Sequence, residues 1–224
     1  MMWCVGVLTE EYRRRMYELL DLYARPWRAD EPVICIDEKS KQLLRDSRGG
    51  LPMTSGMPRR IDYEYLRAGT RNIFVAVEPR AGRRFAQVTM RRSKPEFVRF
   101  AQRLIDGTYR SARRIHLVLD NLSTHFKRCF VDTLGAAAAQ QLLRRVVFHY
   151  TPRHGSWLNM AEIELAALGR QCLNRRIGDQ ETLEFEVAAW QRHRNRERRK
   201  IEWTFTRQDA DRKLGRHFVS KLTC

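Results

Sequence analysis

Apolar positions along the chain form two kinds of pattern, short continuous runs and longer stretches with helical spacing. A run that is apolar at almost every position is typical of a strand buried on both faces of a sheet. The first strand, Val33–Glu38, has this character, and so does the run Ile115–Leu119, which ends in Asp120. Three further strands are predicted at Ile73–Val77, Phe85–Met90 and Arg145–Tyr150, with a shorter extended piece at Tyr63–Arg67.

Helical spacing appears between and around these strands. Ser93-Lys-Pro-Glu96 reads as the start of a helix, because serine is a good N-cap and proline is tolerated in the first turn. Residues 39–62 are polar and rich in glycine and proline, and therefore predict a long loop. The remaining predicted helices are Glu10–Tyr23, Thr124–Leu134, a helix through the alanines to Leu143, Leu158–Cys172, Glu181–Arg194 and Asp209–Leu214.

The order of these elements predicts the fold class. Three strands that can form an antiparallel meander come first, and helices then alternate with further strands. This order indicates an α/β fold with a ribonuclease-H-like mixed sheet, an antiparallel meander plus parallel strands, flanked by helices. We expect residues 1–30 to be a connecting helix and linker, and residues 31–224 to be one catalytic domain with C-terminal helices.

Charge narrows the class of partner. The chain has 43 Lys and Arg against 26 Asp and Glu, a net charge of +17, which favours a polyanionic partner such as nucleic acid. No apolar run is long enough to span a membrane, and no signal peptide is apparent. The 5 cysteines are widely spaced and read as reduced thiols. We therefore expect a cytoplasmic, nucleoid-associated protein that binds DNA and no membrane.

Acidic residues follow two of the predicted buried strands. Asp37 and Asp120 stand where these strands are expected to end, and Glu162 or Glu164 lies on a later helix. Ligand sites of open α/β sheets lie at the carboxyl ends of strands. A few oxygen ligands suit Mg²⁺ or Mn²⁺, and two such ions can support phosphodiester chemistry. The alternative for Asp120 is a helix cap.

Several blocks of sequence resemble a known family. They are Cys35-Ile-Asp-Glu38, Asp62-Tyr-Glu-Tyr-Leu-Arg67, Leu119-Asp-Asn-Leu-Ser-Thr-His125, His149–Glu164, Gln171–Leu173, Trp190 with Arg194-Asn195, and Trp203–Phe205. In this order they resemble the DDE transposases of the IS-six-thirty insertion sequences, part of the Tc-one/mariner superfamily. The resemblance extends over essentially the whole chain.

The resemblance implies a catalytic site made of Asp37, Asp120 and Glu162, which would hold two Mg²⁺ or Mn²⁺ ions. It implies cleavage of double-stranded DNA at transposon ends and strand transfer to a target, usually at a TA dinucleotide, by a chain that could act as a homodimer. Leu158-Asn-Met-Ala-Glu162 departs from the superfamily block, because Met-Ala replaces Pro-Ile. The 41 residues between Asp120 and Glu162 are also several more than is usual.

Family members normally begin with helix-turn-helix modules, whereas this chain begins at the connecting helix. We therefore expect an N-terminally truncated transposase. A catalytically silent remnant that only binds DNA is the alternative function, and the intact acidic triad argues against it. A related nuclease or resolvase with the same sheet is a third reading that nothing in the resemblance favours.

Periodicity alone does not choose between Glu162 and Glu164. Two positions on a helix point about 200° apart, so only one of them can face the site. The resemblance favours Glu162, and we expect Glu164→Gln to keep most activity. His125 is expected to orient the loop after Asp120 rather than to react. Candidate DNA contacts are Arg153, His154, Trp157, Arg175, Arg176, Arg194, Arg198, Arg199 and Lys200.

Overall fold

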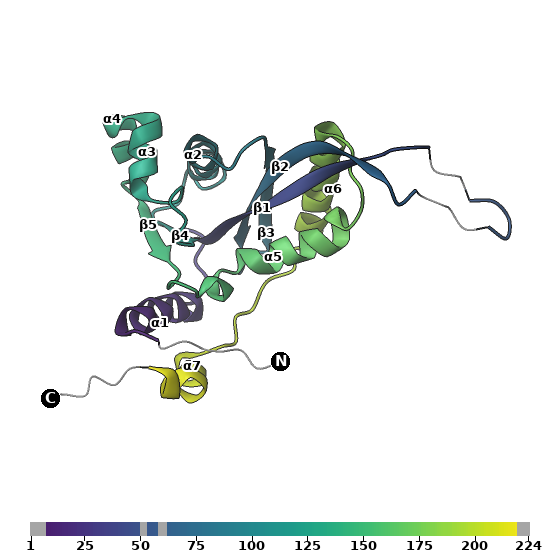
Figure 1. Cartoon of the computed structure of the whole chain (residues 1–224). Helices are drawn as coiled ribbons and strands as arrows, with labels where there is room; N and C mark the ends of the chain where they lie inside the picture. The colour runs from purple at the N-terminus through teal and green to yellow at the C-terminus, as the bar shows by residue number, and fades with distance from the viewer. Residues whose placement is uncertain (1–7, 50–52, 58–61, 219–224) are drawn as a thin grey trace.

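A five-stranded mixed sheet forms the centre of the computed structural model, which describes residues 8–49, 53–57 and 62–218. The strand order is β3-β2-β1-β4-β5, with β1 in the middle (Figure 1). β1 pairs antiparallel with β2 and parallel with β4, so the predicted mixed sheet is confirmed. The strands are β1 (Val33–Asp46), β2 (Tyr65–Glu78), β3 (Arg83–Thr89), β4 (Ile115–Leu119) and β5 (Val146–Tyr150).

Seven α-helices surround the sheet within the described residues. Their starts follow local chemistry: the Thr9 side chain accepts from the backbone of Tyr12, and Ser93 forms a capping box with Glu96. The helices are α1 (Glu10–Ala24), α2 (Lys94–Arg103), α3 (Lys127–Leu134), α4 (Ala136–Leu143), α5 (Ala161–Leu168), α6 (Gln180–Glu197) and α7 (Arg207–Leu214).

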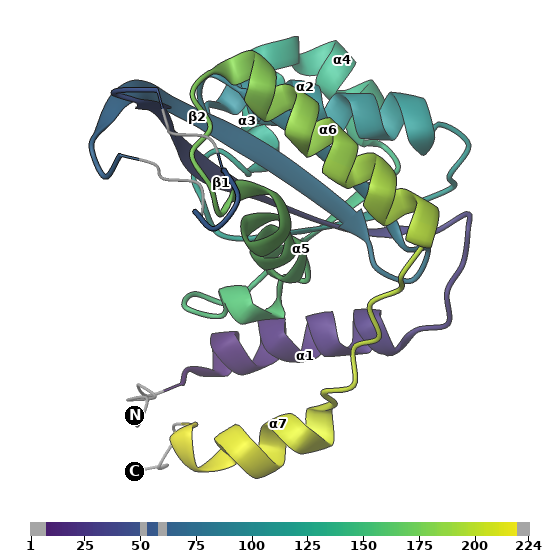
Figure 2. The same ribbon diagram turned by 90° about the vertical axis from the view of Figure 1, so that its right-hand side faces the viewer.

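Both faces of the sheet are covered by helices. Ile34 and Ile36 of β1 pack with α2, α3 and α4 on one face, in a cluster that includes Phe97 and Phe130. On the other face α1 packs near Cys35, while α5 and α6 pack against the β1–β2 hairpin (Figure 2). Since neighbouring residues of a strand point to opposite faces, Asp37 shares the face of Cys35, and Glu38 shares the face of Ile36.

The prediction of a long loop after Glu38 was wrong in part, because β1 continues to Asp46. Its outer half pairs with β2 from Lys39↔Ile73 to Asp46↔Tyr65, so the separate strands predicted in residues 63–77 are one strand. Most side chains of these pairs are polar and lie in solvent, but Leu43 is buried in the cluster that includes α5 and α6. Backbone pairing and this single buried leucine hold the hairpin, and one apolar position does not predict a strand.

The predicted helix Leu158–Cys172 is divided into three pieces. A 3₁₀ turn (Ser156–Leu158) leads to α5, and a π-helical turn (Gly169–Leu173) follows α5 directly. The apolar residues predicted for this segment are nevertheless buried, from Leu158 to Cys172. A similar π-helical turn (Leu104–Thr108) extends α2, and a 3₁₀ turn (Gly215–His217) follows α7.

The last helix returns to the first. α7 lies beside α1 (Figure 2), and Arg13 pairs with Asp211 at 3.3 Å. Leu8 donates its backbone N–H to the carbonyl of His217 at 2.8 Å. In the part of the chain that the structure describes, no helix combines the length and apolar character needed to cross a membrane.

Candidate active site

Asp37 and Asp120 come together because β4 is shorter than β1. The parallel ladder between these strands ends at Cys35↔Val118, and continuing its register by two residues brings Asp37 beside Asp120. The expectation that Asp37 ends its strand was wrong, since β1 runs on to Asp46. The residue still lies at an open edge, because β4 stops at Leu119 and leaves that side of β1 without a neighbouring strand. This edge is the carboxyl end of the parallel strands.

Asp37 lies in an environment that disfavours its charge. Burial, together with the negative charges of Glu38, Asp120 and Glu162, raises the pKa of Asp37 to about 7. The backbone N–H of Glu38 donates to Asp37 Oδ1 at 2.8 Å and opposes that shift. The excess of negative charge at this point is what a divalent cation would neutralise.

Asp120 is held by hydrogen bonds to one of its oxygens. Its Oδ1 accepts from the backbone N–H of Leu122 at 3.0 Å and contacts His125 Nδ1 at 2.6 Å. Burial alone would raise the pKa of Asp120, but these hydrogen bonds leave that pKa below its ordinary value. The alternative role as a helix cap does not fit α3, whose N-cap position is Phe126.

Asn159 connects the α5 helix to β1 next to Asp37. Its buried side chain donates from Nδ2 to the carbonyl of Ile36 at 2.9 Å, and its Oδ1 accepts from the backbone of Ala161 at 3.1 Å. The backbone carbonyl of Asn159 also accepts from the N–H of Glu162 at 3.1 Å. Glu162, which is partly exposed, is thereby placed where its charge acts on Asp37.

Glu164 faces away from this group of acids. Its carboxylate is fully buried between Arg84 at 2.8 Å and Arg194 at 3.1 Å. Burial would raise the pKa of Glu164, but the two guanidinium groups hold it below the ordinary value. Of the two glutamates that periodicity left open, the structure brings Glu162 toward Asp37 and uses Glu164 to join β3, α5 and α6.

The donor chemistry of the three acids fits a hard divalent cation. Within the described residues, Oδ2 of Asp37 and Oδ2 of Asp120 accept no hydrogen bond from the protein, so each can serve as a ligand. No three acidic, histidine or cysteine side chains among those residues already converge on one point. Binding would therefore require small side-chain movements of the acids toward the ion.

The predicted DNA contacts separate into free and engaged side chains. Arg194 is only 12% exposed and is bound to Glu164, so we correct its assignment as a DNA contact. Arg175 pairs with Glu186, and Arg176 pairs with Asp46 at 2.9 Å. Exposed side chains that remain on the surface are those of Arg153, His154, Arg198, Arg199 and Lys200, of which Arg199 contacts Glu197.

Trp157 packs in a partly exposed group of aromatic side chains. Its ring stacks on Trp203 at a centroid distance of 6.2 Å and meets Phe205 edge-on at 5.5 Å. Its indole N–H donates to the hydroxyl of Tyr12 at 3.3 Å. With 40% of the residue still exposed, its main contacts tie the loop before α5 to α1 and the C-terminal segment.

Two basic residues near the acids were not predicted. Arg92 places a guanidinium nitrogen 3.8 Å from Glu38 Oε1, and its side chain is 59% exposed. Lys39 lies two residues after Asp37 on the same face of β1. The Nζ of Lys39 lies close to Gly169, because a Cβ placed on that glycine would be 3.4 Å away from it. Strand alternation would have identified Lys39 if β1 had been predicted to continue.

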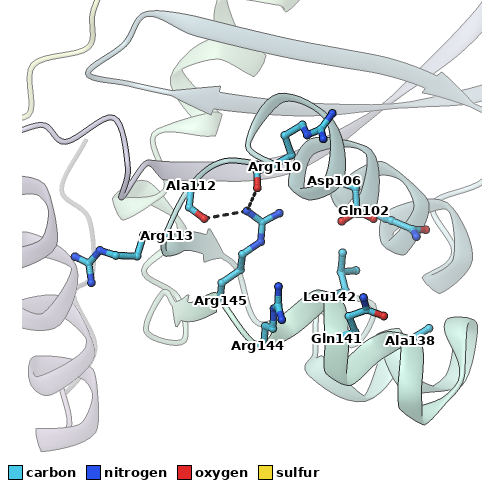
Figure 3. A pocket seen from close by; sticks show the side chains of 10 residues that line it. All are labelled: Gln102, Asp106, Arg110, Ala112, Arg113, Ala138, Gln141, Leu142, Arg144 and Arg145. Carbon is cyan, nitrogen blue, oxygen red and sulfur yellow. Dashed lines mark hydrogen bonds between the residues drawn. The ribbon is translucent and has the colours of Figure 1, made fainter.

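One cavity lies away from these acids. It measures about 670 Å³ and opens between α2 and α4, at the amino-terminal ends of β4 and β5 (Figure 3). Arg145 crosses it to bind the backbone carbonyls of Arg110 at 2.7 Å and Ala112 at 2.9 Å, while Arg113 pairs with Glu31 at 2.5 Å. Two of its arginines thus hold the fold together, and the acids lie at the opposite ends of the strands.

Comparison with solved structures identifies similar folds. A pre-cleavage Mos1 transpososome has a TM-score of 0.57 at 14% identity, covering 97% of this chain and 66% of that one. A Mos1 transposase paired-end complex with the left transposon end has a TM-score of 0.54 at 16% identity, covering 88% of this chain. This chain spans 63% of the length of that transposase chain. At such identities the likeness establishes the ribonuclease-H-like fold.

The sequence itself supplies the family. No curated protein matches the chain significantly. Residues 32–184, more than half of the chain, match the DDE superfamily endonuclease family. The matched segment runs from the start of β1 into α6 and contains Asp37, Asp120 and Glu162. The chain therefore belongs to the DDE superfamily endonuclease family.

Proposed function

We propose that this chain is the catalytic domain of a DNA transposase of the IS-six-thirty type. It cleaves DNA strands at transposon ends and transfers them to a target, usually at TA, in a reaction that depends on divalent metal. The observation that carries the proposal is the placement of Asp37 beside Asp120 at an open edge of the sheet, inside the segment that matches the family, with Glu162 close enough for its charge to act on Asp37.

The similar structures support the same reaction class. Mos1 transposase has been solved with a transposon end, in a strand transfer complex, and in a paired-end complex with Mn. We extend these properties to the present chain as part of the proposal, along with double-stranded DNA as its partner. A homodimer and a cytoplasmic, nucleoid-associated location belong to the same proposal.

Asp37, Asp120 and Glu162 are the residues that would hold the metal. Two Mg²⁺ or Mn²⁺ ions held by these acids would supply activation of the attacking oxygen and stabilisation of the leaving one. The protein itself orients the ligands: Asn159 fixes the start of α5 relative to β1, and the N–H of Glu38 fixes Asp37. The scissile phosphate would lie where β4 has ended and β1 continues without a neighbouring strand on that side.

Basic side chains near this edge would hold the DNA backbone. Lys39 shares the face of Asp37, and Arg92 lies beside Glu38. The exposed residues Arg153, Arg198 and Lys200 extend the basic surface. Phosphate contacts position DNA without reading its sequence, so these residues would contribute affinity rather than choice of site.

Cleavage of a transposon-end oligonucleotide in Mn²⁺ or Mg²⁺ tests the proposal. We expect Asp37→Asn, Asp120→Asn and Glu162→Gln each to lower the rate by about 1,000-fold or more, a barrier increase of about 4 kcal/mol. The matched control is Glu202→Gln, an exposed glutamate outside the acidic group, which should keep its rate.

Two results would contradict the proposal. If the wild-type chain binds the duplex but cuts it with neither metal, the DNA-binding remnant is the better description. If the three variants cut as well as the control does, the acids have another purpose. Circular dichroism on each variant separates loss of cleavage from loss of fold.

A further inference from the structure

A buried chain of polar side chains connects the strands that carry the two aspartates. His125 Nδ1 lies 2.6 Å from Asp120 Oδ1, and His125 Nε2 lies 3.2 Å from Glu38 Oε2. The second contact falls short of a well-aligned hydrogen bond, yet neither of its two atoms has another partner within the described residues. The chain Glu38–His125–Asp120 therefore spans from β1 to the end of β4.

The first two members of this chain are remote from solvent. The side chains of His125 and Glu38 are 0% and 4% exposed, and the His125 ring lies 4.5 Å from the Phe97 ring. Glu38 follows Asp37 directly but points to the other face of the sheet. Neither side chain can touch DNA, so His125 can influence the reaction only through Asp120. Glu38 can act through His125 and also through its charge on Asp37.

The contact with His125 fixes how Asp120 presents its carboxylate. Oδ1 receives both His125 and the N–H of Leu122, which occupies that oxygen and stops rotation of the group. Oδ2 is then the oxygen that has no protein partner among the described residues and is available to a ligand. Outer partners that orient a ligating group typically change metal affinity 10–100-fold when they are removed.

We propose that His125 and Glu38 are positioning residues for the metal site: His125 holds Oδ1 of Asp120, and Glu38 holds His125. This inference rests on the proposed function. It differs from a purely structural role, in which His125 would only fold the loop after β4. A structural role predicts lower stability with unchanged metal affinity, whereas positioning predicts weaker metal binding by molecules that are still folded.

Two substitutions of His125 each remove one of its two contacts and keep the other. The amide of asparagine reaches the place of Nδ1, so His125→Asn can still donate to Asp120 while losing Glu38. The amide of glutamine reaches the place of Nε2, so His125→Gln keeps Glu38 while losing Asp120. The two variants leave one contact each in the same buried position, and similar stability is expected of them.

The experiment measures Mn²⁺ binding to the full chain by electron paramagnetic resonance, without any cleavage assay. We expect His125→Gln to bind Mn²⁺ about 10–100-fold more weakly than wild type, and His125→Asn to stay within about threefold. Glu38→Gln, which keeps the shape of the side chain, should weaken binding by an intermediate factor. His149→Asn is the control, because His149 is also buried but contacts His116 and Glu18 instead.

The outcomes separate this inference from the proposed function. If wild type binds Mn²⁺ and His125→Gln binds it equally well, positioning is overturned while the transposase proposal stands. If wild type binds no Mn²⁺ even with DNA present, both fail. If both His125 variants unfold, Glu38→Gln decides, and unchanged affinity in that variant overturns the inference.

Discussion

Two buried groups of charged side chains lie on opposite faces of the sheet and differ in balance and access. Glu164 is enclosed by Arg84 and Arg194, with the Glu164 and Arg84 side chains fully buried. On the other side, Glu38 and His125 lead to Asp120, whose side chain is 33% exposed. The first group has an excess of positive charge and no opening. The second has an excess of carboxylates and ends at an open edge.

The difference indicates which carboxylates are available to a ligand. The carboxylate of Glu164 has its oxygens committed to guanidinium groups, so it stabilises the packing of α5 on β3 and α6. Asp37 and Asp120 each keep one oxygen without a protein partner among the described residues, and the pKa of Asp37 is raised to about 7 by burial and neighbouring negative charge. A closed, neutralised acid is structural, whereas an acid left uncompensated at an edge is suited to binding a cation.

The largest change in the free energy of unfolding is expected from removing the charge of Glu164, which is enclosed by Arg84 and Arg194. Glu164→Gln leaves Arg84 buried without its counter-charge and leaves Arg194 with Glu197 alone, at 3.5 Å, which should lower the free energy of unfolding by about 3–5 kcal/mol. Urea denaturation measures it, with Glu162→Gln as the control expected to change stability by less than about 1 kcal/mol. This revises the sequence-based expectation for Glu164→Gln: the folded fraction should keep its activity, but that fraction should shrink.

A triple replacement provides the reverse test of the same group. Arg84→Met, Glu164→Leu and Arg194→Met together remove every charge, and replacing a buried ion group by apolar residues is often neutral or stabilising. Recovery of stability in the triple variant identifies uncompensated charge as the cause in Glu164→Gln. A triple variant as unstable as the single one would point to lost packing instead.

A smaller change in stability, this time an increase, is expected from a substitution of Asp37 at the open edge. In chelator at pH 8, Asp37→Asn should be more stable than wild type by about 1–3 kcal/mol, because it removes a buried charge that other carboxylates repel. The pKa of Asp37 is about 7 in the folded protein, whereas the ordinary pKa of an aspartate, which applies to the unfolded chain, is 3.8. The folded state therefore binds the extra proton between these values, and wild type regains stability as pH falls through 7.

Denaturation from pH 8 to pH 4 checks this, and the advantage of Asp37→Asn should shrink below pH 7 and disappear near pH 4, where the unfolded carboxyl is protonated as well. Glu164 behaves oppositely: its pKa is lowered, so its contribution is lost only as pH falls below about 4.5. An advantage of Asp37→Asn that is as large at pH 4 as at pH 8 would show that the charge of Asp37 is not the cause.

The smallest effect concerns exposed charge. Binding to duplex DNA should weaken steeply with salt, with a slope of about −0.9 for each phosphate neutralised. Arg153→Gln with Lys200→Gln should reduce that slope by up to about 2, whereas Arg176→Gln should alter it little because Asp46 already occupies its guanidinium. Fluorescence anisotropy at several salt concentrations measures the slopes. A flat salt response in the wild-type chain would count against DNA as the partner.

The body of the fold could be predicted from sequence because apolar runs mark strands that are buried on both faces. β4 is buried at every position, and β1 is apolar up to Ile36. The outer half of β1 could not be predicted, since it is held mainly by pairing with β2 and buries Leu43 alone among its apolar side chains. The register between β1 and β4 could not be predicted either, and this register is what brings Asp37 beside Asp120.

Periodicity could not choose between Glu162 and Glu164 because their partners are distant in sequence. The choice is made by Arg84 on β3 and Arg194 on α6, which enclose Glu164, and by Asn159, which ties the start of α5 to β1. The resemblance supplied Glu162 through motif position alone. Local pattern predicted that an acid lies here, and tertiary contacts decide which acid faces the open edge.

The alternation of β1 has a consequence for how this chain can change over generations. Asp37 and Glu38 are neighbours on opposite faces, so inserting or deleting one residue between Val33 and Asp37 would exchange the two faces and remove both groups at once. The end of the hairpin beyond Leu43 is under no such restriction, because it carries neither the acids nor a fully buried side chain of β1. Length variation among descendants of this sequence should therefore collect in the hairpin and be absent from the first five residues of β1.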